Sequence, residues 1–309
     1  MKIAFVFPGQ GSQAVGMLKG YDGLPELEQV RREATDSLGQ DFLKILDEGP
    51  AEKLNLTVNT QPAMVTAGYA AYRAWRALGG PAPAVVAGHS LGEYTALVAA
   101  GALTFGACLP LVRFRAQAMQ EAVPEGKGAM AAIINLDDDK VREACAAAGG
   151  EVQAVNFNSP GQVVIAGEKS AVERAMEKCK ALGAKRALPL PVSAPFHSTL
   201  MKPAGLRLRE YLERVALAKT AIELINNVDV MPESDPARIK DALVRQAYSP
   251  VRWAEAVRKM LASGVTHVVE CGPGKVLAGL TRRIDPGVQS FALADRASLE
   301  QALAALKGA

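Results

Sequence analysis

Short, uninterrupted runs of apolar residues alternate with longer segments of helical periodicity along most of the 309-residue chain. Ile3–Phe7 and residues 84–87 are apolar runs that end at once in Pro8 and Gly88, a pattern typical of strands buried in a parallel sheet. Residues 61–78 have helical spacing and are followed by Gly-Gly-Pro, which ends a helix. The alternation of these two kinds of segment predicts an α/β fold.

The pattern changes near residue 129. A strand, a helix, two strands, a helix and a strand follow within about sixty residues, the βαββαβ order of a ferredoxin-like unit. Beyond residue 191 the alternation of helices and apolar strands returns and continues to residue 293, with 232–236 expected to be only a surface loop. We therefore predict a large α/β subdomain with a parallel central sheet, formed by residues 1–124 and 193–309, and an inserted ferredoxin-like small subdomain, residues 125–192.

Charge and cysteine content exclude several classes of function. The 35 Lys and Arg against 32 Asp and Glu give a net charge of +3, too small and dispersed for a nucleic-acid-binding surface. The four cysteines form no Cys-x-x-Cys pair, so no zinc site and no disulfide framework is expected. No run approaches the ~20 apolar residues of a membrane span, and the N-terminal run is too short for a signal peptide. We expect a cytoplasmic protein without nucleic-acid, membrane or metal partners.

Ser90 is the centre of Gly88-His89-Ser90-Leu91-Gly92, between an apolar run and a segment of helical spacing. Gly-x-Ser-x-Gly at a strand-to-helix turn is the nucleophile-elbow pattern, in which flanking glycines make room for a strained serine. An ordinary turn with a helix-capping serine would have a similar sequence. The preceding strand and the following helix favour the elbow, so Ser90 is the predicted nucleophile.

A serine nucleophile needs a base within hydrogen-bond reach, and the chain has three histidines. His89 adjoins the serine on a strained turn, where neighbouring side chains generally point apart, and His267 lies in an apolar run typical of a structural strand. His197 lies in a loop before a helix, which favours it as the base. Asp229 and Glu270 each end an apolar run, and the spacing does not choose between them as an orienting acid.

Anion-binding groups are also present near the predicted elbow. The backbone N–H of Leu91 begins a helix and is suited to bind an oxyanion, and the Gly9-Gln10-Gly11 loop is expected to supply a second donor. Arg113 and Arg115 lie on the second helix after the elbow. Either could hold an anionic substrate by paired hydrogen bonds, although most arginines lie at the surface.

Ordered motifs extend along nearly the whole chain, from Ile3 to about Leu293, and together closely resemble those of the bacterial malonyl-CoA:acyl carrier protein transacylase family. They are Phe7-Pro8-Gly9-Gln10-Gly11-Ser12-Gln13, Gly88-His89-Ser90-Leu91-Gly92-Glu93-Tyr94, Arg115, Val155-Asn156-Phe157-Asn158-Ser159-Pro160-Gly161-Gln162, Val192-Ser193-Ala194-Pro195-Phe196-His197, Val244-Arg245-Gln246 and Gly272-Pro273-Gly274.

This resemblance implies a fold and a reaction. The fold is an α/β-hydrolase-like body with a ferredoxin-like lobe. The reaction is a ping-pong transfer, for fatty acid biosynthesis, of malonyl from malonyl-CoA to the phosphopantetheine thiol of acyl carrier protein, without a cofactor. Ser90 would carry the acyl group, His197 would act as base and then as acid, and Arg115 would pair with the free malonyl carboxylate.

The resemblance also assigns the supporting groups. Gln10 and Leu91 would supply the backbone oxyanion donors. Gln246 would orient the histidine through its carbonyl, which makes the site a Ser-His dyad and removes the need for an acid. The bulky ring of Phe196 would crowd an α-methyl group and so favour malonyl.

Three alternatives share parts of this pattern. An esterase with the same elbow would not need Arg115, and a non-catalytic carrier-binding protein would tolerate loss of the serine. A free-standing acyltransferase of polyketide synthesis would differ only in its carrier. Lys185, Arg186 and Lys275 are candidates for contact with an acidic carrier, although solvated surface charges are commoner.

Overall fold

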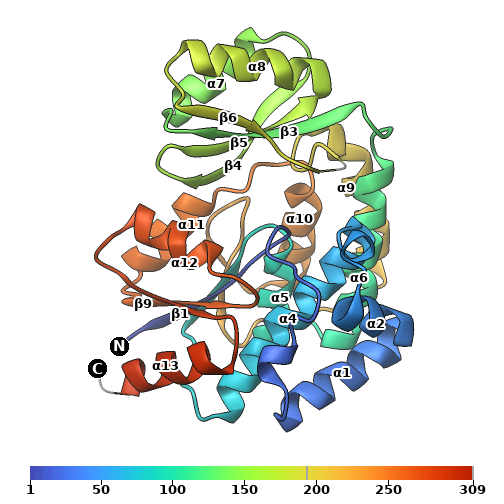
Figure 1. Cartoon of the computed structure of the whole chain (residues 1–309), viewed down its shortest axis with the longest axis vertical. Helices are drawn as coiled ribbons and strands as arrows, with labels where there is room; N and C mark the ends of the chain where they lie inside the picture. The colour runs from blue at the N-terminus through green and yellow to red at the C-terminus, as the bar shows by residue number, and fades with distance from the viewer. Residues whose placement is uncertain (193, 308–309) are drawn as a thin grey trace.

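The computed structural model describes residues 1–192 and 194–307. Two β-sheets lie within these residues, one above the other in Figure 1, and the predicted α/β class is confirmed. The predicted subdomain boundary at residue 193 and the last two residues of the large subdomain lie outside the described residues. No helix in the described ranges is long and apolar enough to span a membrane.

The lower sheet in Figure 1 has the strand order β10-β9-β1-β2-β7-β8. Its first five strands are parallel, as predicted. The edge strand β8 pairs antiparallel with β7, and Pro236 begins the helix Pro236–Gln246, so the loop expected at 232–236 is wrong for its first two residues and its last. Two residues are too few to show alternation, and proline is compatible with an edge strand. The strands are β1 (Ile3–Phe7), β2 (Val85–Gly88), β7 (Glu223–Ile225), β8 (Pro232–Glu233), β9 (His267–Cys271) and β10 (Gln289–Leu293).

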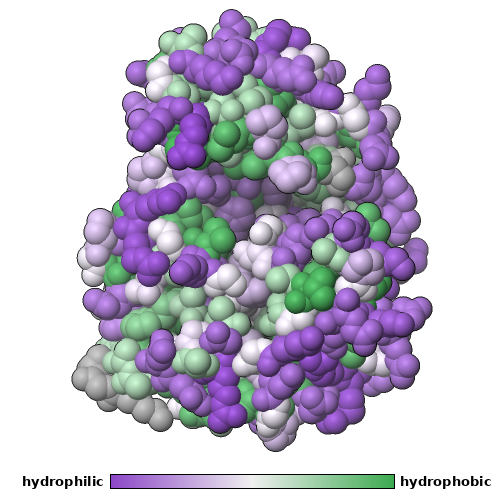
Figure 2. All heavy atoms as spheres, in the orientation of Figure 1, coloured by the Kyte–Doolittle hydropathy of each residue, from purple (hydrophilic) through white to green (hydrophobic). Residues whose placement is uncertain are grey.

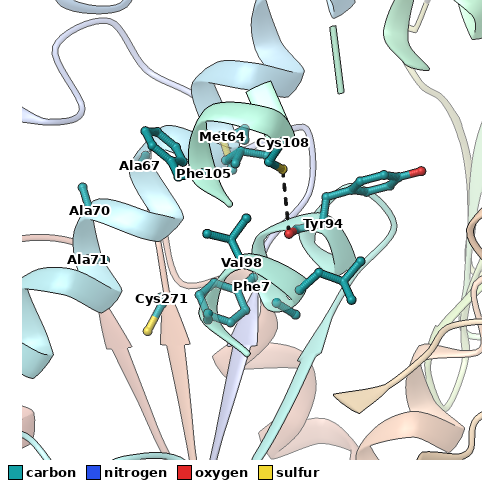
Figure 3. Close-up of a cluster of buried hydrophobic side chains, with 14 of the residues drawn as sticks. Phe7, Met64, Ala67, Ala70, Ala71, Tyr94, Val98, Phe105, Cys108 and Cys271 are labelled. Carbon is teal, nitrogen blue, oxygen red and sulfur yellow. Dashed lines mark hydrogen bonds between the residues drawn. The ribbon is translucent and has the colours of Figure 1, made fainter. Parts of the chain in front are cut away.

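Helices bury both faces of this sheet. On one face Phe5 and Phe7 join a large apolar cluster with helices α4 and α6, part of which Figure 3 shows. On the other face Ala4 and Val6 pack in a cluster with Trp253 of α11. Burial on both faces explains why β1 is continuously apolar. The helices of the body are α1 (Pro25–Leu38), α2 (Gln40–Glu48), α3 (Ala51–Leu54), α4 (Thr57–Ala77), α5 (Gly92–Ala99), α6 (Phe105–Glu121), α9 (Lys202–Glu213), α10 (Pro236–Gln246), α11 (Trp253–Ala262), α12 (Val276–Ile284) and α13 (Arg296–Lys307), with short 3-10 helices at Lys19–Tyr21 and Thr199–Met201.

The upper sheet is antiparallel, in the order β4-β5-β3-β6, and the predicted βαββαβ element order is confirmed. Helices α7 and α8 lie on its outer side, away from the body (Figure 1). Ala131 and Ile133 pack under these helices, whereas Met130 belongs to a separate cluster that contacts Phe196. The inner face of the small sheet is therefore free to cover the body. The elements are β3 (Gly128–Ile134), α7 (Asp138–Ala147), β4 (Val152–Ser159), β5 (Gln162–Glu168), α8 (Lys169–Ala181) and β6 (Arg186–Pro189).

Two glycines permit the close contact between the turn after β2 and strand β1. A Cβ atom on Gly92 would lie 1.9 Å from the carbonyl oxygen of Phe7, and one on Gly88 would lie 1.9 Å from the carbonyl carbon of Gly92. Both distances are far inside van der Waals contact with backbone atoms. Neither glycine can therefore be replaced without moving the turn.

We predict that Gly92→Ala lowers the free energy of unfolding by about 3 kcal/mol or more, because the added methyl group must displace backbone atoms of β1. Urea denaturation measures this loss. The control is Gly279→Ala in α12, where a Cβ meets no atom within 4 Å, and it should stabilise the protein by about 0.5 to 1 kcal/mol. Equal stability of the two variants would contradict the steric argument.

Candidate active site

A cavity lies between the inner face of the small sheet and the carboxyl ends of the body strands, where the surface is hollowed in Figure 2. Crevices at the carboxyl ends of parallel strands are the usual ligand sites of α/β folds. Polar groups come mainly from the body and apolar groups mainly from the lobe above. The lining residues are Gln10, His89, Ser90, Arg115, Met119, Met130, Asn156, Val164, Leu190, Val192, Phe196 and His197.

Ser90 follows β2 on a turn with an unusual backbone conformation. Its φ is +50°, which costs a residue with a side chain about 1–3 kcal/mol. The buried Asn227 holds this turn from both sides. Its Oδ1 accepts the Ser90 N–H at 2.7 Å, and its Nδ2 donates to the Gly88 carbonyl oxygen at 2.7 Å. Sequence reasoning missed Asn227, although it follows β7, the neighbour of β2, and so lies at the same end of the sheet.

The Ser90 hydroxyl and the His197 imidazole form a hydrogen bond, with 2.7 Å between Oγ and Nε2. On the other side of the ring, Nδ1 lies 2.8 Å from the main-chain oxygen of Gln246. A carbonyl oxygen only accepts hydrogen bonds, so Nδ1 carries the proton and Nε2 is free to accept the serine proton. The geometry is that of a hydroxyl beside a correctly oriented base.

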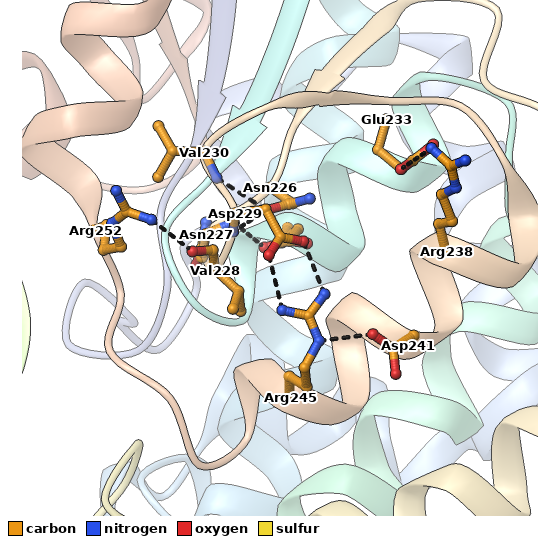
Figure 4. A network of polar contacts seen from close by, with 11 residues as sticks. Asn226, Asn227, Val228, Asp229, Val230, Glu233, Arg238, Asp241, Arg245 and Arg252 are labelled. Carbon is orange, nitrogen blue, oxygen red and sulfur yellow. Dashed lines mark hydrogen bonds and ion pairs between the residues drawn. The ribbon is translucent and has the colours of Figure 1, made fainter.

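Neither carboxylate that the sequence left open contacts this histidine within the described residues. Asp229 forms a two-pronged ion pair with Arg245, which Figure 4 shows, with both N–O distances 2.8 Å. Glu270 is buried and accepts the Ala278 N–H at the start of α12 at 2.8 Å. The Gln246 carbonyl therefore occupies the position that an acid has in a full triad.

The other two histidines have separate partners. His89 Nε2 lies 2.8 Å from Asn158 Oδ1, and its ring packs against Trp253. His267 begins β9 and stacks on Phe291. Both placements agree with the expectation that neither is the partner of the serine.

Arg115 reaches the serine from α6. Its Nη2 donates to Ser90 Oγ at 3.2 Å and to Gln246 Oε1 at 3.0 Å, while Nη1 donates to Gln61 Oε1 at 2.9 Å. The side chain is 2% exposed and lies over the ring of Tyr94. Within residues 1–192 and 194–307 no carboxylate forms an ion pair with it. The guanidinium is thus a buried positive charge beside the hydroxyl.

Arg113, the other arginine that the sequence left open, has a different environment. Its guanidinium lies over the ring of Phe42, and the residue is only partly buried. It is not among the residues that line the cavity. Of the two candidates, Arg115 is the one that the fold brings to Ser90.

The predicted oxyanion donors lie in the loops after two paired strands. Phe7 of β1 pairs with Gly88 of β2, so the loops that contain Gln10 and Leu91 leave the sheet side by side. Within the described ranges, neither backbone N–H donates to a protein acceptor. The Gln10 side chain is held by Gln61, whose Nε2 donates to its Oε1 at 3.1 Å.

Burial changes the proton affinities of the site. Burial and the neighbouring Arg115 charge lower the pKa of His197 to about 3, although the Gln246 carbonyl opposes this shift. Burial raises the pKa of Glu93 to about 7, against the effect of hydrogen bonds from Gln246 and Asn227. The imidazole therefore stays neutral, the form that a base requires.

No group of three or more His, Cys, Asp or Glu that could hold a metal ion occurs in the described part of the chain.

The low pKa of His197 predicts a pH-dependent stability. Below its usual pKa of 6.5 the unfolded chain binds a proton that the folded chain binds only near pH 3, so the neutral ring contributes stability above pH 6.5 that is lost as the pH falls. Between pH 6.5 and 4.5 wild type should lose about 2 kcal/mol relative to His197→Gln. Urea denaturation at several pH values measures this difference. The buried glutamates Glu93 and Glu270 are present in both proteins, so their contribution to the pH dependence cancels.

The control for this measurement is His267→Gln, at a half-buried residue whose pKa burial lowers without the full burial of His197, and it should stay much closer to wild type. Parallel stability curves for wild type and His197→Gln would show that burial does not hold the His197 ring neutral.

Comparison with known proteins places this geometry in a family. A model described as the acyl transferase domain matches residues 4–298. The malonyl CoA-acyl carrier protein transacylase of Escherichia coli (strain K12) is 54% identical over 305 residues, 98% of this chain and 99% of that protein. The transacylase of Bacillus subtilis (strain 168) is 45% identical over 310 residues, 99% of this chain and 98% of that protein.

Solved structures agree. The acyl-carrier-protein S-malonyltransferase of Burkholderia pseudomallei is 62% identical, with a TM-score of 0.97 over 98% of this chain and 100% of that one. A malonyl-transacylase in complex with a type II PKS acyl-carrier protein is 51% identical, with a TM-score of 0.96 over 99% of this chain and 100% of that one. These matches confirm the resemblance of the motifs, and the chain belongs to the acyl transferase family and, within it, to the bacterial malonyl CoA-acyl carrier protein transacylases.

Proposed function

We propose that this chain moves a malonyl group from malonyl-CoA to the phosphopantetheine thiol of acyl carrier protein, through an ester on Ser90. The observation that carries the proposal is the buried Arg115 guanidinium, 3.2 Å from the serine oxygen, with only neutral hydrogen-bond partners in the described residues. A malonyl ester would bring its free carboxylate to this charge. An acetyl ester would leave the charge unpaired, which is costly in a buried site.

The first half-reaction loads the serine. His197 Nε2 takes the hydroxyl proton as Ser90 Oγ attacks the thioester carbonyl carbon, and the carbonyl oxygen becomes an oxyanion. The N–H groups of Gln10 and Leu91 donate to that oxyanion. Collapse of the intermediate breaks the carbon–sulfur bond, and the imidazolium returns its proton to the departing CoA sulfur. The Gln246 carbonyl holds the ring throughout, because Nδ1 keeps its proton in both states.

The second half-reaction repeats these steps with the carrier. The phosphopantetheine thiol gives its proton to His197 and attacks the ester carbonyl, and Ser90 leaves and recovers the proton. No electrons are exchanged, so the scheme needs no cofactor. The solved relative that binds an acyl-carrier protein supports the carrier as the second substrate. We place the reaction in the cytoplasm, as part of fatty acid synthesis.

Intact mass measurement after mixing with malonyl-CoA should detect one malonyl group on the wild-type chain and none on Ser90→Ala. Added acyl carrier protein should remove the group and carry it itself. Release of the group as free malonate in the absence of carrier, as fast as the transfer, would instead indicate an esterase. A wild-type chain that gains no malonyl group would contradict the proposed transfer through Ser90.

Arg115→Ala should lower the rate of malonyl loading at least about 100-fold, because the carboxylate then enters a buried site without a partner. Acetyl loading should fall much less or rise. The matched control is Arg113→Ala, which removes an arginine from the same helix outside the cavity and should leave both rates near wild type. Equal losses of malonyl and acetyl loading in Arg115→Ala would contradict charge recognition.

A further inference from the structure

No carboxylate of the described residues is in direct contact with the Arg115 guanidinium, but the Glu93 carboxylate is connected to it through one intervening side chain. A buried charge without compensation is unfavourable. The interaction with Glu93 opposes the loss of the Arg115 charge, and the interaction with Arg115 likewise favours ionised Glu93. Glu93 is the second residue of α5 and is 1% exposed. Neither the elbow chemistry nor the sequence motifs gave it a role.

A single side-chain amide separates the two charges. Gln246 Oε1 accepts from Arg115 Nη2 at 3.0 Å, and Gln246 Nε2 donates to Glu93 Oε2 at 2.9 Å. The same Nε2 donates to the Ser90 carbonyl oxygen at 3.0 Å. The same Glu93 oxygen also accepts the N–H of Asn227 at 3.0 Å, the residue that holds the serine turn. Glu93 is thus connected both to the guanidinium and to the elbow.

The charge of Glu93 determines the direction of the amide. An ionised carboxylate only accepts hydrogen bonds, so the nitrogen of the Gln246 side chain must face Glu93 and its oxygen must face Arg115. A carboxylate in direct contact with Arg115 would occupy the donors that an anionic substrate needs. In this structure the Gln246 amide lies between the Glu93 carboxylate and the guanidinium of Arg115. The carboxylate can then orient the guanidinium and partly compensate its charge, while the donors that face the cavity stay available to an anionic substrate.

We infer that Glu93 is a positioning residue for malonyl selection, which acts on Arg115 through the side chain of Gln246. This inference rests on the proposed function, because it concerns the carboxylate of the proposed substrate. His197 depends on the main-chain carbonyl of Gln246 and not on its amide. Loss of the Glu93 charge should therefore weaken the choice of malonyl over acetyl more than it weakens serine loading in general.

The test uses Glu93→Gln, which keeps the shape of the side chain and removes its charge. Single-turnover loading of Ser90 from malonyl-CoA and from acetyl-CoA is followed by intact mass at pH 8, above the pKa of about 7 that burial gives Glu93. The ratio of the two rate constants should fall about tenfold. The matched control is Glu270→Gln, an equally buried carboxylate whose pKa is also raised to about 7 but which caps α12. It should leave the ratio unchanged.

An unchanged ratio in Glu93→Gln, with both rates equally lowered or both intact, would overturn the inference. An equal fall of the ratio in Glu270→Gln would also overturn it, since that would mark a general effect of losing a buried charge. If Glu93→Gln does not fold, Gln246→Met replaces it, because methionine removes the amide and keeps the main-chain carbonyl. An unchanged ratio there would likewise refute the link. Failure of wild type to form a malonyl ester would instead refute the proposed function.

Discussion

The parallel pairing of β1 with β2 is the constraint on which the site depends. Phe7 lies opposite Gly88, so the glycine loop after one strand and the serine turn after the other leave the sheet together. Gly92 must approach the Phe7 carbonyl more closely than any side chain permits. The same contact fixes the start of α5 and the left-handed backbone of Ser90. The proposed nucleophile and the proposed oxyanion donors are thus positioned by backbone pairing and do not rely on flexible side chains.

The charged and titratable side chains around the Ser90 turn are arranged so that the cavity side of Arg115 stays free of carboxylates of the described residues. The imidazole is buried and neutral, the guanidinium is buried and positive, and the carboxylate of Glu93 lies behind an amide. Gln246 connects the three, since its main chain faces His197 and its side chain lies between Arg115 and Glu93. One residue at the end of α10 therefore contacts both the proposed base and the proposed anion-binding arginine. Above them, the inner face of the small sheet contributes the apolar side chains Met130, Val164 and Leu190 to the cavity.

Much of this arrangement follows from local sequence patterns. The continuous apolar runs identified β1 and β2, because strands buried on both faces have no polar positions. The elbow, the histidine in its loop and the two arginines were found from residue type and position. Patterns of this kind did not find the edge strand at Pro232–Glu233, which is too short to show alternation. They also did not identify Asn227, whose role comes from its place beside β2 in the sheet.

The choice among candidates needed contacts between distant segments. The sequence determined that the chain is an α/β protein with a serine elbow, and its ordered motifs identified the family, because local periodicity and close-packed glycines are encoded over a few residues. Spacing alone left Arg113 and Arg115, and Asp229 and Glu270, as open alternatives, and the family resemblance favoured Arg115 and Gln246. Only the tertiary structure showed that Arg115 contacts the serine and that His197 contacts the Gln246 carbonyl and neither acid. It also revealed the path from Glu93 through Gln246 to Arg115, because its hydrogen bonds join residues 131 and 153 positions apart, and sequence spacing does not indicate such contacts.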